Sequence, residues 1–141
     1  MRRIAVRTLV ISLATAGLTT AASFENLTGT WTLRVKNPEH EDVATLTIRF
    51  SNEPARSCMG GNWKRVIVQD ARSTDKGFFP LSDPLSYELE GSKLTIGRNE
   101  VCDAYLHLSG GFDGTKAEGS YEVLGWGSSR PLGEFSLVRS R

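Results

Sequence analysis

Apolar and polar residues alternate along most of the chain beyond residue 22, and this period of two constrains the fold more than any other feature of the sequence. In the segment 30–35, for example, Trp31, Leu33 and Val35 share one face, and the segment 45–50 repeats the pattern. Successive side chains of a β-strand point to opposite faces, so each segment predicts one buried and one solvated face. Beyond residue 22, no stretch keeps a 3.6-residue apolar period for three turns. The alternation therefore predicts an all-β protein.

Turn signals divide the alternating segments into eight strands in sequence order. The pairs Gly91-Ser92 and Asp113-Gly114 are typical of tight hairpins. The expected strands cover residues 30–35, 45–50, 63–70, 85–90, 93–97, 102–112, 115–124 and 133–140. Short connections favour a single domain over residues 23–141 that is an eight-stranded antiparallel up-and-down barrel, or a closely related sandwich. Closure into a barrel also removes free sheet edges.

The first 22 residues are typical of a secretory signal peptide. They begin with arginines, continue with an apolar run from Leu9 to Leu18 and end with small residues that suit cleavage near Ala22. The apolar run is too short to span a membrane. The leader therefore predicts a periplasmic or secreted protein.

The net charge gives no support for a polyanionic partner. The leader holds three of the 17 basic residues and none of the 16 acidic residues, so the rest of the chain carries two more acidic than basic residues. The basic residues form no block beyond the leader. Electrostatics thus offers no support for nucleic-acid binding or for an anionic membrane surface.

Export favours a disulfide between the two cysteines, Cys58 and Cys102. A reactive thiol pair would need an environment that lowers a thiol pKa, and a zinc site from these cysteines and two separated histidines lacks the usual ligand spacing. The bond requires Cα atoms within about 7 Å. The expected strands put Cys58 at one end of the barrel and Cys102 at the other. Either the segment 51–62 folds back over the outside of the barrel, or the strand count is off by one between Gly91 and Cys102.

An arginine occupies an inward position near the chain end. Arg139 falls on the same face of the last strand as Phe135 and Leu137, which is the apolar face. In a closed meander the end of the last strand lies beside the start of the first strand, where Trp31 provides an aromatic face for the guanidinium. The alternative is a frayed terminal arginine in solvent.

The stretch LTGTW (Leu27 to Trp31), together with Arg139, resembles the end-closing signature of the calycins, the superfamily of lipocalin, fatty-acid-binding and avidin-like barrels. The resemblance implies that Gly29 allows the chain to turn into the barrel, that Trp31 seals the closed end, and that Arg139 packs across the tryptophan. It also implies that the opposite mouth admits a small apolar ligand. An avidin-like or unassigned bacterial barrel fits the length better than a lipocalin does.

The loops expected at the mouth carry the candidate binding residues. Alternate connections of a meander emerge at one end, here Lys36–Asp42, Ala71–Pro84, Gly97–Val101 and Gly125–Leu132. The side chains selected from them are Phe78, Phe79, Trp126, Arg130 and His40. Phe78 and Phe79 either plug the mouth or contact a partner. Trp126, which lies between two glycines, is the strongest recognition residue.

Catalytic patterns are weak, and we predict no enzyme, metal or cofactor. His107 alternates with Asp103 and Tyr105 on a face that is polar and therefore expected to meet solvent. The segment His40–Asp42 could ligate a metal, but it matches an ordinary solvated acidic loop better. The sequence contains no serine elbow, phosphate-binding loop or metalloprotease motif.

Two classes of function remain. The first is an exported binding barrel that takes a small apolar or amphipathic ligand at its mouth. The second is a loop-mediated protein binder, such as an inhibitor of a secreted hydrolase. The residues expected to point into the barrel are bulky, which slightly favours an interior filled with side chains.

Overall fold

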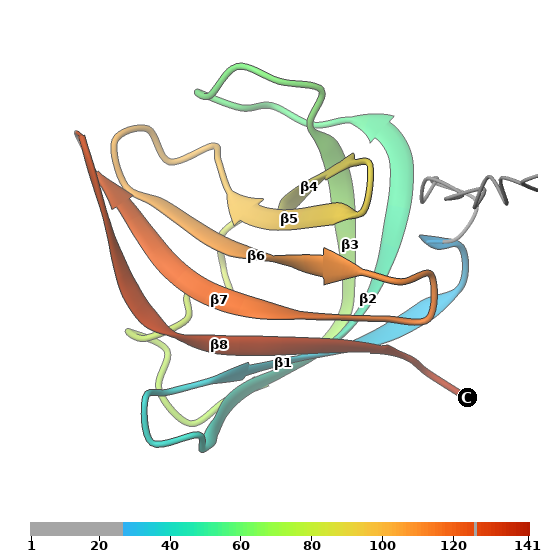
Figure 1. Cartoon of the computed structure of the whole chain (residues 1–141), viewed down its shortest axis with the longest axis horizontal. Coiled ribbons are helices and arrows are strands. Elements are labelled where there is room, and N and C mark those ends of the chain that lie inside the picture. Colours follow the sequence, from blue (N-terminus) through green and yellow to red (C-terminus); the bar gives the residue numbers. More distant parts are fainter. Residues whose placement is uncertain (1–26, 126) are drawn as a thin grey trace, which may run out of the picture.

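Figure 1 shows the computed structural model of the chain, which describes residues 27–125 and 127–141. Eight antiparallel strands form one closed barrel in sequence order. The strands are β1 (Thr30–Lys36), β2 (Asp42–Pro54), β3 (Lys64–Ser73), β4 (Ser86–Glu90), β5 (Lys93–Arg98), β6 (Tyr105–Phe112), β7 (Lys116–Gly125) and β8 (Ser128–Arg139). The predicted up-and-down barrel is confirmed. The predicted signal peptide lies outside the described residues.

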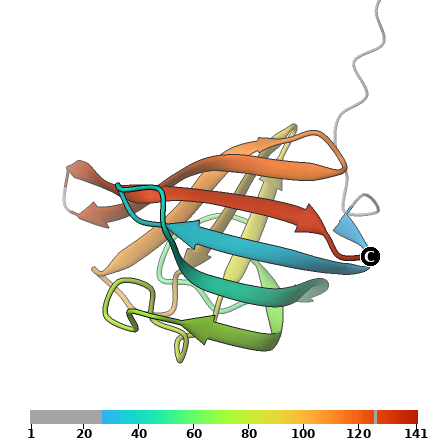
Figure 2. The same ribbon diagram turned by 90° about the horizontal axis from the view of Figure 1, so that it is seen from below.

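The first and last strands close the barrel. β1 pairs with β8 through Trp31 opposite Arg139, Leu33 opposite Leu137 and Val35 opposite Phe135. Figure 2 shows the end of the chain beside the start of β1. This register directs the alternating apolar residues of both strands inward, because residues directly opposite each other lie on the same face.

The interior of the barrel is packed with side chains. Its most deeply buried large residues, each less than 2 % exposed, are Trp31, Tyr87, Tyr121, Leu27, Leu33, Leu46, Ile48, Leu94, Ile96, Leu108, Leu137 and Val35. At eight strands, a barrel is just wide enough for such residues to fill it. The space inside the barrel is therefore taken by the core rather than left for a ligand.

Glycines let β6 and β7 approach closely where they pair. Gly110 lies opposite Gly119, and a β-carbon added at Gly119 would stand 2.0 Å from the carbonyl oxygen of Ser109. No side chain fits at that distance. On its other side, Gly119 pairs with the buried Phe135 of β8.

Several strand ends differ from those predicted. β6 begins at Tyr105, three residues later than expected, so Cys102 lies in a loop. β8 begins at Ser128, so Arg130 belongs to a strand rather than to a mouth loop. The start of β8 is polar, so its sequence does not alternate between apolar and polar residues. It pairs with the end of β7 in a hairpin that projects beyond the barrel (Figure 1). Pairing there buries little apolar surface.

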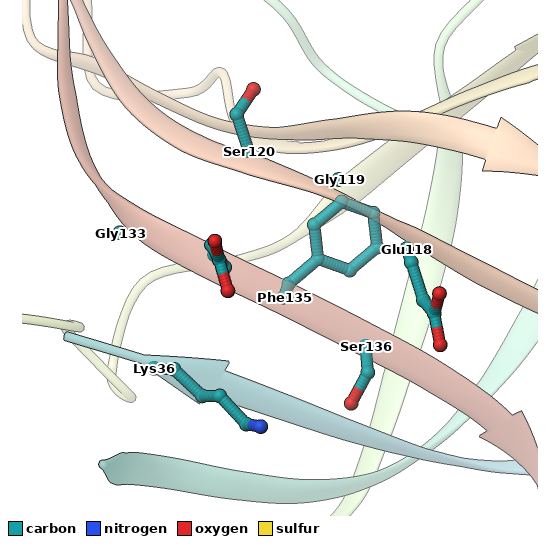
Figure 3. Close-up of a pocket in the computed structure, with 8 residues that line it drawn as sticks. Lys36, Glu118, Gly119, Ser120, Gly133, Phe135 and Ser136 are labelled. Carbon is teal, nitrogen blue, oxygen red and sulfur yellow. The ribbon is translucent and has the colours of Figure 1, made fainter. Parts of the chain in front are cut away.

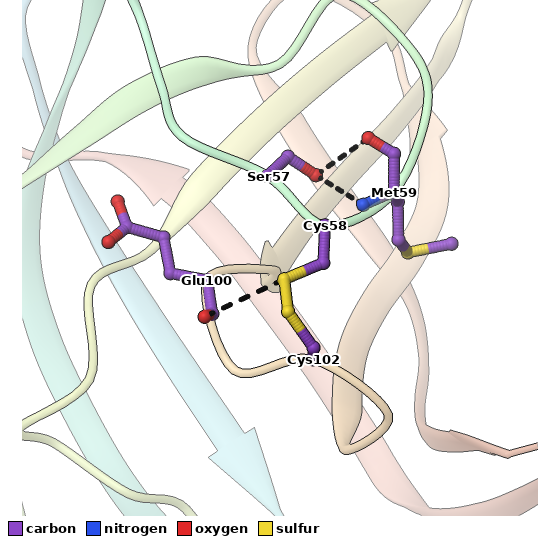
Figure 4. Close-up of a disulfide and its surroundings, with 5 residues drawn as sticks. All are labelled: Ser57, Cys58, Met59, Glu100 and Cys102. Atoms are coloured by element: carbon purple, nitrogen blue, oxygen red, sulfur yellow. Dashed lines mark hydrogen bonds between the residues drawn. A yellow bond between two sulfur atoms is a disulfide. The ribbon is translucent and has the colours of Figure 1, made fainter.

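The segment 55–63, here called the cover, folds back over the outside of the barrel. Cys58 and Cys102 form the predicted disulfide, with Cα atoms 5.4 Å apart (Figure 4). The Cys58 N–H also donates to the Asn99 carbonyl oxygen at 2.9 Å. The strand count was therefore correct, and the fold-back alternative is confirmed for residues 55–62, whereas residues 51–54 extend β2.

The stagger of the strands explains how the two cysteines meet. Ser86 of β4 pairs with Arg65 near the start of β3 and with Gly97 near the end of β5. The last residues of β5 are thus level with the first residues of β3. The cover leads into the start of β3, and the loop that contains Cys102 follows the end of β5. Both segments therefore join the barrel at the same level along its axis.

The seam between β3 and β4 is short. Only Lys64 and Arg65 of β3 pair with β4, followed by one hydrogen bond from the Val66 N–H to the Leu85 carbonyl oxygen. From Ile67 to Ser73, β2 is the one strand among the described residues that pairs with β3. The expectation that closure removes every free sheet edge is therefore wrong for β3.

Candidate functional site at the barrel mouth

The closed end of the barrel is sealed by Trp31. This residue is fully buried, and its indole N–H donates to the Leu27 carbonyl oxygen at 2.9 Å. The Arg139 guanidinium carbon lies 4.5 Å from the centre of the tryptophan ring, and the guanidinium also donates to the Thr28 carbonyl oxygen. Gly29 turns the chain here with a φ of 95°. The Trp31 indole and the Arg139 guanidinium therefore both have partners within the chain.

At the opposite end, the connection between β3 and β4 packs across the mouth. Phe79 is 3 % exposed, and its ring centre lies 5.6 Å from that of Tyr121. Phe78 is partly exposed beside the same tyrosine, whose hydroxyl donates to the Phe78 carbonyl oxygen at 2.7 Å. Burial raises the pKa of Tyr121 to about 12, which keeps this hydroxyl protonated as a donor. Phe79 is therefore a core residue, whereas Phe78 lies at the rim.

A hollow of about 290 Å³ opens beside Phe78, and we call it the mouth hollow. Its lining residues are Gly77, Phe78, Pro80, Arg98, Leu106, Val123, Arg130 and Leu132. Most of these side chains are apolar, and the two charged ones are both arginines. The structure thus brings together two of the predicted site residues, Phe78 and Arg130.

Sequence reasoning missed Arg98, the second basic residue of the mouth hollow. Its guanidinium donates to the Asp83 carboxylate at 2.9 Å and to the Ala104 carbonyl oxygen at 2.5 Å. Its Nε atom is buried and has no hydrogen-bond partner among the described residues. Such an N–H group normally finds an acceptor, because leaving it unpaired costs about 1–3 kcal/mol. Arg98 could have been found by the alternation that places Leu94, Ile96 and Arg98 on one face.

The remaining predicted residues do not join this site. His40 lies in the exposed β1–β2 loop with a φ of 65°, and its Nδ1 is 3.2 Å from a carboxylate oxygen of Glu134. It does not line the mouth hollow. Trp126 lies outside the described residues, so its prediction stays open. The described residues contain no group of three or more potential metal ligands.

A larger hollow of about 610 Å³ lies on the outside of the wall, over β1, β7 and β8 (Figure 3). Its side chains are mostly polar, with Lys36, Glu118 and Ser120 among them. Opposite charges are mixed, and Glu118 lies 3.7 Å from Lys116 in an exposed ion pair. The charged residues of this hollow carry both signs, so it lacks the single sign of charge that two arginines give the mouth hollow.

His107 lies on the outer face of β6, but the expectation that this face meets solvent is wrong for this residue. The cover buries it to 8 % exposure, with the Trp63 ring centre 5.5 Å from the imidazole. His107 Nε2 lies 2.8 Å from Asn99 Oδ1, and the Asn99 amide donates to the Ser86 hydroxyl at 2.9 Å. Burial lowers the pKa of His107. Alternation separates the two faces of a strand but cannot reveal what packs on the outer one.

This buried cluster does not have the geometry of a catalytic site. A histidine base must contact the nucleophile that it activates. Here Asn99 lies between the imidazole and the Ser86 hydroxyl, and all three residues are buried. The cluster fastens the cover to the barrel wall.

Comparisons with known proteins identify no related protein or family. No protein-family model matches the chain, and searches of curated proteins and of solved structures give no significant match. The part of the chain that the structure describes also has no helix with the length and apolar character needed to cross a membrane. The resemblance to calycins therefore stays a prediction, and the mouth hollow is the candidate site on its geometry alone.

Proposed function

We propose that this protein binds a small amphipathic molecule with an acidic group in the mouth hollow. The supporting observation is the pairing of an apolar wall with Arg98 and Arg130 at one opening. Ligand sites typically combine apolar lining with a few polar groups that orient the ligand. A molecule with one acidic end and one apolar end matches this arrangement.

The packed interior limits where such a ligand would lie. Phe79 and Tyr121 fill the barrel beneath the mouth, so the ligand would lie across the opening rather than inside. The volume of about 290 Å³ is near the lower end of the range for ligand pockets, roughly 300–1,000 Å³. A compact ligand with a short apolar chain is therefore favoured.

The two arginines would have different roles. Arg130 forms no ion pair among the described residues, so its charge is available to an anion. Arg98 is already paired with Asp83, and its unpaired Nε–H is buried, so it would add only a weak positive potential at the hollow. Because Asp83 compensates the charge of Arg98, Arg130 would supply most of the electrostatic attraction.

The setting of this function would be the periplasm or the outside of the cell. A disulfide in a small barrel is compatible with an exported protein. The leader-like residues 1–22 support the same proposal from the sequence.

Calorimetric titration of the exported protein with decanoate and with decan-1-ol tests the proposal. These probes share the same alkyl chain length and differ in the acidic group. We expect decanoate to bind at least about tenfold more tightly, which corresponds to about 1.4 kcal/mol. Arg130→Gln should remove most of this difference, whereas Arg49→Gln, on the outside of β2, should leave it unchanged. Equal binding of both probes, or of neither, would reject an acidic amphipathic ligand.

Loop-mediated protein binding, for instance inhibition of a secreted hydrolase, is the second candidate. The filled interior and the hairpin that projects beyond the barrel favour it. In that case an exported protein should be captured from culture fluid, and Trp126→Ala should weaken the capture without lowering Tm. The first candidate instead expects a small molecule to accompany the protein in native mass spectra.

A further inference from the structure

We propose that the free edge of β3, residues Ile67–Ser73, binds an extended segment of a partner protein as an added β-strand. This surface is separate from the mouth hollow and does not depend on the proposed ligand. The inference rests on three features of β3: unpaired backbone groups, exposed apolar side chains and a pattern of charges.

The backbone of β3 lacks a neighbour on one side. Lys64 pairs with Tyr87, and the Val66 N–H donates to the Leu85 carbonyl oxygen, so even-numbered residues direct their backbone groups towards β4. Val68 is the next residue in this alternation, and β4 does not reach it. Figure 1 shows β3 continuing beyond β4. An extended strand is the structure that satisfies such a row of donors and acceptors.

Two apolar side chains at this edge are unusually exposed. Ile67 is 45 % exposed on the outer face, and Val68 is 39 % exposed although it lies opposite the fully buried Ile48. Val68 thus belongs to the inner face of the barrel and is exposed because no neighbouring strand covers it. An added strand would shield both side chains from water.

Charges beyond these residues specify what the added strand should carry. Asp70 and Arg72 both lie on the outer face, and their side chains are 64 % and 86 % exposed. Their mutual contact, at 3.7 Å, is an exposed ion pair of the kind that contributes little to stability. The matching strand would place a basic residue opposite Asp70, an acidic residue opposite Arg72 and apolar residues towards the barrel.

The same features disfavour pairing with a second copy of this chain. The register between β2 and β3 shifts at Gln69, so the edge has a local bulge. Two copies paired about a two-fold axis at Asp70 would bring two aspartates opposite each other. An axis at Ala71 would pair Asp70 with Arg72 of the second copy, but only the end of β3 would then lie against Ile67 and Val68, because β3 ends at Ser73. Bulges and edge charges are known means of preventing indiscriminate edge pairing. The edge therefore suits a different protein with complementary charges.

A designed peptide tests this inference on the exported protein. The peptide acetyl-Glu-Val-Lys-Val-Thr-amide, laid antiparallel to β3, places its glutamate opposite Arg72, its lysine opposite Asp70 and its threonine opposite Ile67, with Gln69 bulged out. We expect saturable binding in calorimetry, together with slower amide hydrogen exchange confined to residues 67–73. The same peptide with alternate backbone nitrogens methylated cannot pair as a strand and should bind at least tenfold more weakly.

Variants of the protein separate edge pairing from general apolar adhesion. Val68→Lys should weaken peptide binding at least tenfold, and Ile67→Lys provides a second variant if the first fails to fold. Val138→Lys is the matched control because Val138 is 38 % exposed on β8, which is paired on both sides. Equal binding of the methylated peptide, protection outside residues 67–73, or equal loss in Val138→Lys would overturn the inference. So would a dimer without peptide that Val68→Lys abolishes, because the edge would then belong to a second copy.

Discussion

The contact between Arg139 and Trp31 can be measured as an interaction free energy. Trp31 is fully buried, and Arg139 lies over its ring at 4.5 Å from the centre. We expect Trp31→Leu to lower the free energy of unfolding by about 2–4 kcal/mol, because it leaves a cavity and removes a partner of the buried Leu27 carbonyl oxygen. Arg139→Gln should cost about 1 kcal/mol, the usual range of a partly exposed cation–π contact.

A double-mutant cycle isolates the part that belongs to the pair. In the Trp31→Leu background no aromatic face remains, so Arg139→Gln should lose only its other contacts, such as the hydrogen bond to the Thr28 carbonyl oxygen. The coupling should therefore be about 0.5–1 kcal/mol.

Urea denaturation at neutral pH, followed by far-ultraviolet circular dichroism, gives the four free energies of unfolding. Circular dichroism is preferred to fluorescence because one tryptophan is removed. The slopes against urea should agree among the four proteins. A coupling within about 0.3 kcal/mol of zero would refute the contact, since residues that do not touch contribute additively.

Three further measurements test other parts of the structure. Replacing Cys58 and Cys102 by alanine opens a loop with a sequence separation of 44 and should lower the free energy of unfolding by about 4 kcal/mol, measured in urea. The pKa of folded His107 lies below its ordinary value of 6.5, so the unfolded chain takes up the proton first; the free energy of unfolding should fall as pH drops below about 6.5, and His107→Gln should flatten that part of the profile. Gly119→Ala should cost about 1–3 kcal/mol through collision with β6, whereas Gly111→Ala, with open space around it, should stay within about 0.5 kcal/mol by thermal unfolding; similar losses for both would contradict the close approach.

Much of the barrel was predictable because alternation is a local property. Residues such as Trp31 and Leu137 lie on the apolar side of their own segments, and the buried face of each strand follows from that. The prediction was wrong where pairing occurs without burial. The start of β8 around Arg130 pairs with β7 outside the barrel, so no apolar pattern marks it.

The candidate site was predictable only in part. Phe78 and Arg130 were selected from the sequence, and the structure places both beside one hollow. Arg98 was missed, although it continues the inward alternation of β5. Its contacts with Asp83 and Ala104 depend on how the neighbouring loops fold over the mouth, and the sequence has no local signal for that.

The sequence by itself determined which side of each strand is buried and that the two cysteines pair, because these follow from local periodicity and from the predicted compartment. Only the tertiary structure decided where the cover lies, why His107 is buried, and why β3 keeps a free edge. These features depend on the stagger between strands, which is set by pairing between residues distant in the chain. A stagger that joins β4 to only the first residues of β3 brings Cys58 to Cys102 on the outer wall and, for the same reason, leaves the rest of β3 unpaired on the side away from β2.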